Sequence, residues 1–293
     1  MVLHLENDKI IVNKCAPLIS SEQLSDYTVY DYSPFNLKES EKVTIEGGRG
    51  CPFTCSFCST NRFWKNTFRI KPIELLIDEM KCFFNKYAIK CFDINHDLFT
   101  ANQEYIRSFC NKLIQENLGF EWYCSSRVDV LEYDLIDLMK KAGCKGIFFG
   151  IESGSVDVQK KIRKNLNLDN ARQILVYCHK NGIKVVASFI YGLPEENLSD
   201  FYDTMKFIES LLEADIDQIQ LHKFIPFPGT DEYLKVKDRL YFDLLKSDFS
   251  IMYNQNIFTK TMLSDMQKHM DIYPQFMYLI LMLMIIFQQL GSL

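Results

Sequence analysis

The sequence predicts an α/β protein in which parallel strands and outer helices form a partial (β/α)6 barrel of the TIM type. From Val43 onward, six short apolar segments alternate with longer amphipathic segments at helical spacing. This alternation is typical of a parallel sheet with helices outside it, and right-handed crossovers in series curl such a sheet toward a barrel. Six units are fewer than the eight of a closed (β/α)8 barrel, so we expect one open side.

The individual elements are predicted from their periodicity and their end signals. The helix expected over 72–87 begins with Pro72, and the helix expected over 132–143 ends on Gly143. We expect strands over 42–48, 89–95, 120–126, 145–151, 184–192 and 217–227. We expect helices between them over 72–87, 102–117, 132–143, 155–163, 168–181 and 198–214.

The composition is that of an ordinary folded protein, with 47% hydrophobic and 24% charged residues in 293. The net charge of −5 argues against nucleic acid as the main partner, because phosphate binding leaves a basic footprint. The opening segment MVLHLENDKI lacks the pattern of a secretory signal, so the ten cysteines are interpreted as reduced thiols of a cytoplasmic protein. We expect an N-terminal extension over 1–42, a core over 43–233 and a helical C-terminal extension over 234–293.

The C-terminal extension contains a run of twelve apolar residues, FMYLILMLMIIF, over 276–287. A membrane-spanning helix needs about 20 apolar residues, and shorter runs are more often core or interfacial helices. We expect a buried terminal helix; a membrane or protein contact through 276–287 is the alternative, and a true span the least favoured reading.

Three cysteines, Cys51, Cys55 and Cys58, lie on one short loop with the spacing C-x3-C-x2-C. The preceding segment GGRG permits a tight bend, and Pro52 stiffens the start of the loop. Thiolates are the ligands of iron–sulfur clusters, and a four-iron cubane ordinarily takes four of them. Three thiolates would therefore hold three irons and leave one coordination position open, which is typical of catalytic metal sites.

Two other interpretations of these cysteines remain at this point. They could be unrelated buried thiols, or they could bind zinc together with a distant residue such as His96 or Cys91. The remaining cysteines carry no second cluster pattern. Those in helical or strand patterns are predicted to be small core residues: Cys82, Cys91, Cys110, Cys124, Cys144 and Cys178.

The segment CPFTCSFC, with Phe57 directly before the third cysteine, resembles the signature of the radical S-adenosylmethionine (radical SAM) enzymes. The resemblance implies a [4Fe-4S] cluster on Cys51, Cys55 and Cys58, whose open iron binds the amino and carboxylate groups of SAM. It also implies that reduction cleaves SAM to methionine and a 5′-deoxyadenosyl radical, which abstracts hydrogen from a substrate. The family fold is a partial (β/α)6 barrel, the same fold that the alternation of segments predicts.

Segments after the next three strands also resemble this family. NHDLFT is similar to a DDxFT segment and keeps Asp97; SSRVD is similar to an sRvD segment and contains Arg127. Arg127 could pair with the SAM carboxylate, or form a salt bridge with Asp129 instead. Strand four ends in GIESGS, where the resemblance implies that Glu152 accepts from the amino group or ribose of SAM.

The fifth strand, in SFIYGLPEE, resembles the G-x-I-x-G-x-x-E pattern that helps to form the adenine pocket in the family. Ile190, Gly192 and Glu195 are in place, and Ser188 stands where the first glycine is usual. The last strand leads to FIPFPGTDEY, which resembles the end of the core in cobalamin-type members. The resemblance covers roughly residues 43–233.

Upstream, DYTVYDYSPF resembles the linker that joins a cobalamin domain to this core in some relatives. About 42 residues precede the first expected strand, and the D-x-H-x-x-G cobalamin motif is absent. The chain is therefore expected to be a cobalamin-type core without its cobalamin domain, and cobalamin is not expected to bind to it.

The resemblance implies an enzyme that acts on a peptide or small metabolite and needs a low-potential electron donor, flavodoxin or ferredoxin. No general base or hydrogen donor is assigned. A tRNA-modifying radical SAM enzyme is an alternative, disfavoured by the acidic balance. A non-catalytic iron–sulfur redox or partner protein is another, disfavoured because a plain electron carrier needs none of the SAM-contacting residues.

Overall fold

The computed structural model describes residues 3–6, 9–12, 17–24, 37 and 41–239. The chain divides into two compact units, Met1–Thr230 and Asp231–Leu293. In the second unit, the described elements are the helix α9 (Asp231–Val236) and the 3-10 turn η3 (Lys237–Arg239). The predicted helix over 276–287 lies outside the described residues. No helix within the described ranges is long and apolar enough to cross a membrane.

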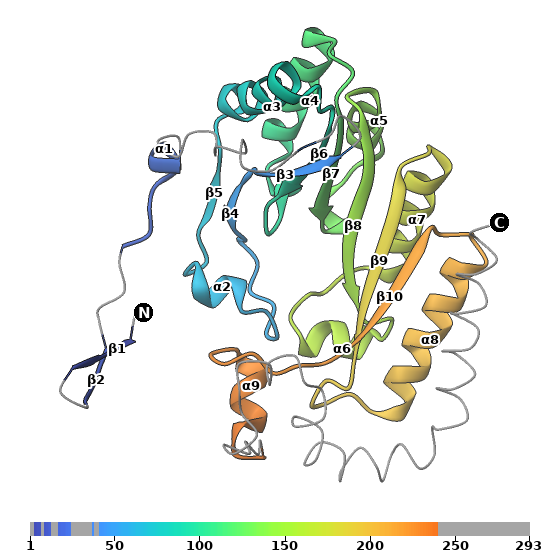
Figure 1. Ribbon diagram of the computed structural model, residues 1–293. Helices are drawn as coiled ribbons and strands as arrows, with labels where there is room; N and C mark the ends of the chain where they lie inside the picture. The colour runs from blue at the N-terminus through green and yellow to red at the C-terminus, as the bar shows by residue number, and fades with distance from the viewer. Residues whose placement is uncertain (1–2, 7–8, 13–16, 25–36, 38–40, 240–293) are drawn as a thin grey trace. The chain divides into compact units, whose positions relative to one another are not determined.

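The first unit contains a six-stranded sheet in which all neighbouring strands are parallel (Figure 1). The order across the sheet follows the order along the chain: β3 (Lys42–Glu46), β6 (Cys91–Asn95), β7 (Glu121–Ser126), β8 (Cys144–Glu152), β9 (Lys184–Tyr191) and β10 (Gln218–Lys223). Each strand lies within one or two residues of a predicted segment, except that β10 ends four residues early. The prediction of a partial (β/α)6 barrel is therefore confirmed.

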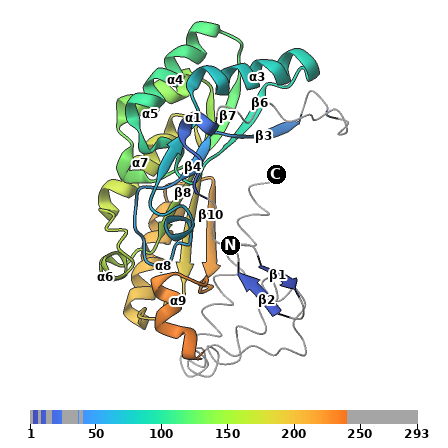
Figure 2. The same ribbon diagram turned by 90° about the vertical axis from the view of Figure 1, so that its left-hand side faces the viewer.

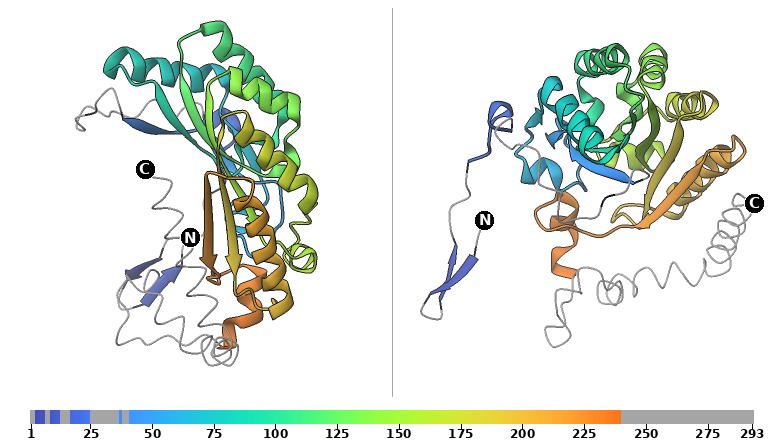
Figure 3. Two further views of the ribbon diagram at one scale, coloured as in Figure 1. Left: turned by 90° about the vertical axis from the view of Figure 1, so that its right-hand side faces the viewer. Right: turned by 45° about the horizontal axis from the view of Figure 1, so that its top comes forward.

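Helices connect successive strands and cover the outer, convex face of the sheet (Figures 2 and 3). They are α3 (Ile73–Tyr87), α4 (Gln103–Glu116), α5 (Tyr133–Lys141), α6 (Val156–Lys161), α7 (Leu168–Lys180) and α8 (Leu198–Leu212). End signals explain their limits. Asn197 and Asp200 form a reciprocal capping box at the start of α8, and Ala88 ends α3 in the left-handed conformation.

The core between the sheet and α3–α5 is built from aromatic side chains. Trp122, Phe92 and Phe109 are fully buried, and the indole nitrogen of Trp122 donates to the Ala142 carbonyl at 2.9 Å. Four of the predicted core cysteines are buried: Cys110, Cys124, Cys144 and Cys178. Burial raises the pKa of the thiols of Cys110 and Cys178, and a hydrogen bond with Cys144 together with burial raises the pKa of the Cys124 thiol, so all three remain protonated and unreactive. Cys82 and Cys91 are half-buried.

Several short elements were not predicted. After β3 the chain forms an antiparallel hairpin of β4 (Gly48–Gly50) and β5 (Phe68–Ile70), with α2 (Thr60–Phe63) between its strands. A side chain at Gly50, whose φ is +92°, would collide with the carbonyl oxygen of Thr67. The other short elements are β1 (Leu3–Glu6), β2 (Lys9–Val12), α1 (Ser21–Leu24), η1 (Phe99–Ala101) and η2 (Val128–Val130).

A buried ion pair fastens the hairpin to the barrel. Lys71, which follows β5, places Nζ 2.7 Å from Oε2 of Glu79 on α3, and both residues are buried. The Lys71 backbone N–H also donates to the Gly47 carbonyl at 2.9 Å. The end of the hairpin is therefore held from α3 and from the end of β3.

We predict that Glu79→Ala lowers the free energy of unfolding by about 3–5 kcal/mol, because it leaves the Lys71 ammonium buried without its partner. Equilibrium urea unfolding measures this loss. The matched control is Glu121→Ala, which breaks the half-exposed pair with Lys145 at 3.0 Å and should cost less than about 1 kcal/mol. Equal losses in the two variants would contradict the role of the buried pair.

Candidate active site

The three cysteines lie on the loop between β4 and α2, on the same side of the molecule as α6 (Figure 1). Cys55 is buried, and Cys51 and Cys58 are half-buried. The Cys58 N–H donates to the Cys55 carbonyl at 3.2 Å, and the Asn61 side-chain amide donates to the same oxygen at 3.1 Å. The Ser56 N–H donates to the Ile162 carbonyl at the end of α6, 3.0 Å away. The loop is therefore anchored at the Cys55 carbonyl and at the residue directly after it.

Asp97 anchors the start and end of this loop. One carboxylate oxygen accepts from the Gly50 N–H at 2.6 Å, and the other accepts from the Thr60 hydroxyl at 3.1 Å. Both oxygens thus face the loop that carries the cysteines. A direct contact of Asp97 with a cofactor stays a prediction, whereas its position supports a role in holding the loop.

Arg127, at the end of β7, joins the cysteine loop to the barrel. Its guanidinium donates from Nε and Nη2 to the two oxygens of Asp129, at 2.9 and 2.7 Å, so the alternative salt bridge is present. Nη1 also lies 3.5 Å from Sγ of Cys55, and the guanidinium carbon lies 3.9 Å from the centre of the Phe53 ring. Arg127 therefore makes the ion pair and contacts a cysteine sulfur at the same time.

Glu152, the last residue of β8, forms a buried ion pair with Lys164. Lys164 Nζ lies 2.7 Å from Oε1 of Glu152, and the Lys164 carbonyl accepts from Arg127 Nη2 at 2.8 Å. Glu152 has a φ of +70°, in the left-handed region where a residue with a Cβ is strained by about 1–3 kcal/mol. A Cβ at Gly150 would collide with the Glu152 carboxylate, so this glycine leaves room for the pair.

The predicted adenine-pocket residues lie on or directly after β9. Ser188 is buried and Ile190 is half-buried; Ser188 is paired in register with Gly150 of β8. Gly192, with a φ of +81°, donates its N–H to the carboxylate of Glu196. Burial raises the pKa of this carboxyl to about 7 although the Gly192 and Leu193 N–H groups oppose the shift.

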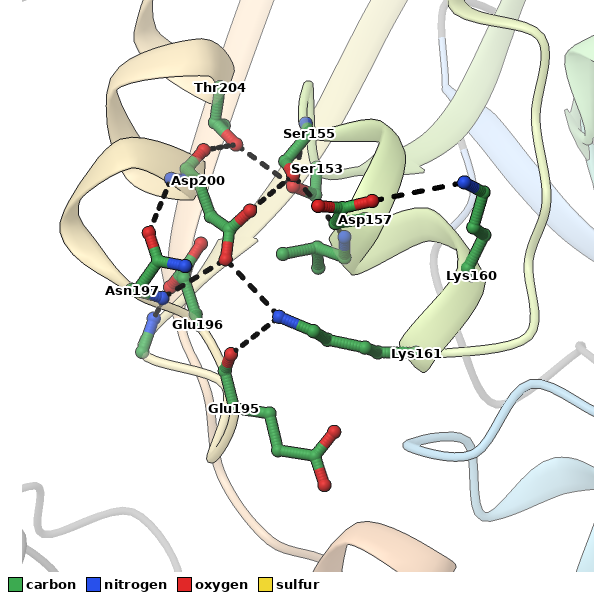
Figure 4. Close-up of polar contacts among 12 residues, drawn as sticks. Ser153, Ser155, Asp157, Lys160, Lys161, Glu195, Glu196, Asn197, Asp200 and Thr204 are labelled. Carbon is green, nitrogen blue, oxygen red and sulfur yellow. Dashed lines mark hydrogen bonds and ion pairs between the residues drawn. The ribbon is translucent and has the colours of Figure 1, made fainter.

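A polar network ties the segment after β8 to the start of α8 (Figure 4). Ser155 Oγ donates to Asp200 at 2.6 Å, and the hydroxyls of Ser153 and Thr204 are 2.9 Å apart. Lys161 donates to Asp200 at 3.4 Å and to the backbone carbonyl of Glu195 at 2.9 Å. In Figure 4 the Glu195 carboxylate points away from this network. The network fixes the segment that directly follows Glu152.

The cysteine donor set fits a cubane iron–sulfur cluster. Burial raises the pKa of the thiols of Cys51 and Cys55, and the nearby positive charge of Arg127 acts in the opposite direction on both. In the part of the chain that the structure describes, no three Cys, His, Asp or Glu side chains converge on a point where one metal ion could bind. The thiolates of a cubane each bind a different iron, so their sulfur atoms need not converge.

Neither His96 nor Cys91 is placed to complete a zinc site with the three cysteines. His96 Nδ1 accepts from the Leu98 N–H at 2.9 Å, and Nε2 lies 3.1 Å from the Arg69 carbonyl, to which it donates. Burial lowers the His96 pKa to about 4, so the ring is neutral and both nitrogens are engaged. Cys91 is the first residue of β6, at the opposite end of that strand from the site.

Two residues near the site, Lys164 and Glu196, were not predicted from the sequence. Lys164 lies twelve residues beyond Glu152, and its only signal is the basic run KKIRK over 160–164. The motif comparison selected Glu195, whereas the structure turns the carboxylate of Glu196 onto Gly192. Phe57, placed next to the third cysteine by the signature, is half-buried.

Comparison with known proteins identifies related sequences. The model of the Radical SAM superfamily matches residues 45–208, more than half of the chain. An uncharacterised methyltransferase of Pyrococcus horikoshii is 31% identical over 228 residues, which are 77% of this chain and 49% of the relative. The anaerobic magnesium-protoporphyrin IX monomethyl ester cyclase of Rubrivivax gelatinosus is 28% identical over 76% of this chain and 40% of its own. The chain spans about half the length of these relatives, or less.

Solved structures show the same fold. The radical SAM methyltransferase TsrM from Kitasatospora setae, with cobalamin and a [4Fe-4S] cluster bound, aligns with a TM-score of 0.61 at 14% identity, over 67% of this chain and 39% of TsrM. Coproporphyrinogen III oxidase from Escherichia coli aligns with a TM-score of 0.50 at 16% identity, over 83% of this chain and 62% of its own. At these identities the likeness concerns the fold.

We predict that Asp97→Ala accelerates loss of a reconstituted cluster about tenfold or more, because the loop loses two hydrogen bonds to a charged group. The decay of the cluster's visible absorbance in the presence of a chelator measures the rate. Asp97→Asn keeps an oxygen that can accept from Gly50 and should recover part of the stability. Decay at the wild-type rate in Asp97→Ala would contradict the anchoring role.

Glu196 is predicted to make stability depend on pH. Its pKa is raised from 4.5 to about 7, so its contribution to stability is complete below about pH 4.5 and is lost as the pH rises through 7. Glu196→Gln carries no charge at any pH. Its free energy of unfolding should therefore rise relative to that of the wild type between about pH 4.5 and 7, by up to about 3 kcal/mol. Urea unfolding over a pH series measures the difference, and a constant offset between the two proteins would refute this assignment.

Proposed function

The chain belongs to the radical SAM superfamily, and we propose that it cleaves SAM reductively to a 5′-deoxyadenosyl radical, which then abstracts hydrogen from a peptide or small-metabolite substrate. Members of this superfamily are enzymes that use a [4Fe-4S] cluster and SAM. The observation that carries the proposal is the gathering of Cys55, Arg127 and the Glu152–Lys164 pair within direct contact of one another.

Cys51, Cys55 and Cys58 would hold the cluster, which, when bound and reduced, supplies one electron to SAM and so breaks the bond between sulfur and C5′. The Arg127 guanidinium donates toward Cys55 and holds the loop against the end of β7. A cation beside a cysteine sulfur also stabilises added negative charge there. Arg127 thus favours the reduced state while it positions the loop.

Glu152 and Lys164 carry opposite charges next to the cysteine loop, and the two ends of the amino acid part of SAM are an ammonium and a carboxylate. We propose that the Lys164 ammonium binds the SAM carboxylate and that the Glu152 carboxylate binds the SAM amino group, because each of these contacts joins opposite charges through a hydrogen bond. Ser188, Ile190 and Gly192 line the end of β9, where they would flank the adenine. The strained backbone of Glu152 fixes the direction of its carboxylate before SAM binds.

Methyl transfer is the second candidate, since the P. horikoshii relative and TsrM are both named methyltransferases. Such a reaction would release S-adenosylhomocysteine, which remains when SAM loses its methyl group, whether or not 5′-deoxyadenosine is formed as well. The two candidates are therefore separated by the SAM-derived product, analysed with and without added cobalamin.

We predict that the anaerobically reconstituted chain forms 5′-deoxyadenosine from SAM with dithionite as the reductant. Liquid chromatography with mass spectrometry measures the product. Cys55→Ala should form none, and Cys82→Ala, at a half-buried cysteine on α3, serves as the matched control and should keep the activity.

Each alternative outcome has a distinct meaning. Formation of S-adenosylhomocysteine on addition of cobalamin, with or without 5′-deoxyadenosine, would favour methyl transfer as the reaction. A cluster with neither product would favour the non-catalytic redox protein. Equal product from Cys55→Ala and the wild type would refute the assignment of the cluster ligands.

A further inference from the structure

The segment that carries the cysteines has a charge opposite to that of the whole chain. Residues 47–72 contain no Asp or Glu, whereas the chain as a whole has a net charge of −5. The segment contains five basic residues: Arg49, Arg62, Lys65, Arg69 and Lys71. Arg49 pairs with Glu46, and Lys71 pairs with Glu79. Of the other basic residues, Arg62 lies on α2 and Lys65 lies on the turn after it.

These residues form an aromatic and basic surface, defined here as Arg62, Phe63, Trp64 and Lys65. Arg62 and Lys65 are exposed, and the Phe63 side chain is 69% exposed, the largest exposed fraction among the large hydrophobic residues of the described part. The Phe63 and Trp64 rings meet edge to face with centroids 4.5 Å apart. Trp64 is half-buried, and an exposed aromatic ring that packs on a second ring between two cations is typical of a protein contact surface.

The surface is rigid before any partner arrives. Lys65 and Asn66 both adopt left-handed backbone angles, with φ of 53° and 55°. The turn is closed by the Asn66 N–H, which donates to the Asn61 carbonyl at 2.8 Å, and by the Thr67 hydroxyl, which donates to the Trp64 carbonyl at 2.6 Å. Little backbone order is lost on binding when a turn is already closed in this way, so the contact gains affinity.

Beneath the surface, Arg69 supplies a further charge. Its guanidinium carbon lies 4.7 Å from the centre of the Trp64 ring, and Nη1 donates to the Ile19 carbonyl at 2.8 Å. Nε and Nη2 are buried and have no hydrogen-bond partner within the described residues. A buried guanidinium with unused donors strengthens the positive potential of the surface above it.

The surface also directly follows the cysteine loop in the chain. Cys58 is separated from α2 by one residue, and Asn61 of that helix donates to the carbonyl of Cys55. Because cluster reduction requires an electron from outside the chain, a donor bound at this surface would be brought against the loop that holds the cluster.

We propose that Arg62, Phe63, Trp64 and Lys65 dock the acidic face of a low-potential electron-transfer protein. The inference rests on the proposed function, since it needs a cluster on the cysteine loop. One electron leaves the reduced flavin or iron–sulfur centre of the donor and enters the cluster, so the donor is oxidised by one electron and no bond forms between the proteins. Opposite charges accelerate the encounter, and the aromatic pair supplies the contact.

The test is stopped-flow reduction of the reconstituted chain by a reduced bacterial flavodoxin, followed by the visible absorbance of the cluster. We expect Arg62→Glu/Lys65→Glu to slow this second-order reaction about tenfold or more, and the wild-type rate to fall as salt is added. Phe63→Ser, which keeps the charges, should slow it by less and retain the salt dependence. Lys206→Glu, at a 75% exposed lysine on α8, is the control and should react as the wild type.

Reduction by dithionite separates docking from damage to the loop. It should be unchanged in Arg62→Glu/Lys65→Glu, and an equal slowing with both reductants would overturn the proposal. A wild-type rate with flavodoxin in that variant would overturn it too. Absence of 5′-deoxyadenosine with dithionite would refute the proposed function alone, because the reduction rate is read from the cluster.

Discussion

One guanidinium, that of Arg127, connects the parts on which the rest of the site depends. It reaches from the end of β7 to Phe53 and Cys55 on the cysteine loop and to the backbone of Lys164 beyond α6. Asp129 holds it by two hydrogen bonds, so its orientation is fixed by its own strand end rather than by the loop. Because a guanidinium presents five donors in a rigid fork, one side chain can satisfy all these partners.

Three positively charged side chains that are buried near the cysteine loop each contact a carboxylate. Lys71 meets Glu79, Lys164 meets Glu152, and Arg127 meets Asp129. The first two pairs join segments that are separate in the chain, whereas the third lies within one strand end. Arg69 departs from this arrangement, because two of its buried nitrogens have no hydrogen-bond partner within the described residues.

The sequence predicted the barrel well, because each strand and helix carries enough residues for its period to be read. The β4–β5 hairpin was not predicted, since three-residue strands show no period and β4 contains two glycines. The cysteine spacing predicts a metal-binding loop, and Arg127 and Glu152 could be placed by their position at the ends of strands. Lys164 could not, because it reaches the site only through the return of the chain after α6. Glu196 was missed because a motif aligns residues but does not decide which of two adjacent carboxylates is turned inward.

The supports of the cysteine loop lie far downstream of it in the chain. Asp97 follows Gly50 by 47 residues, Arg127 follows Cys55 by 72, and Ile162 comes later still. At about 5–20 residues per second, a ribosome would expose the three thiols several seconds before the residues that hold them in place. The nascent loop would therefore be an unorganised set of thiols, and assembly of a cluster on it would follow the addition of β7 and β8 to the sheet and the formation of α6. In this chain, cluster assembly would be a late event that takes place only once the barrel has formed.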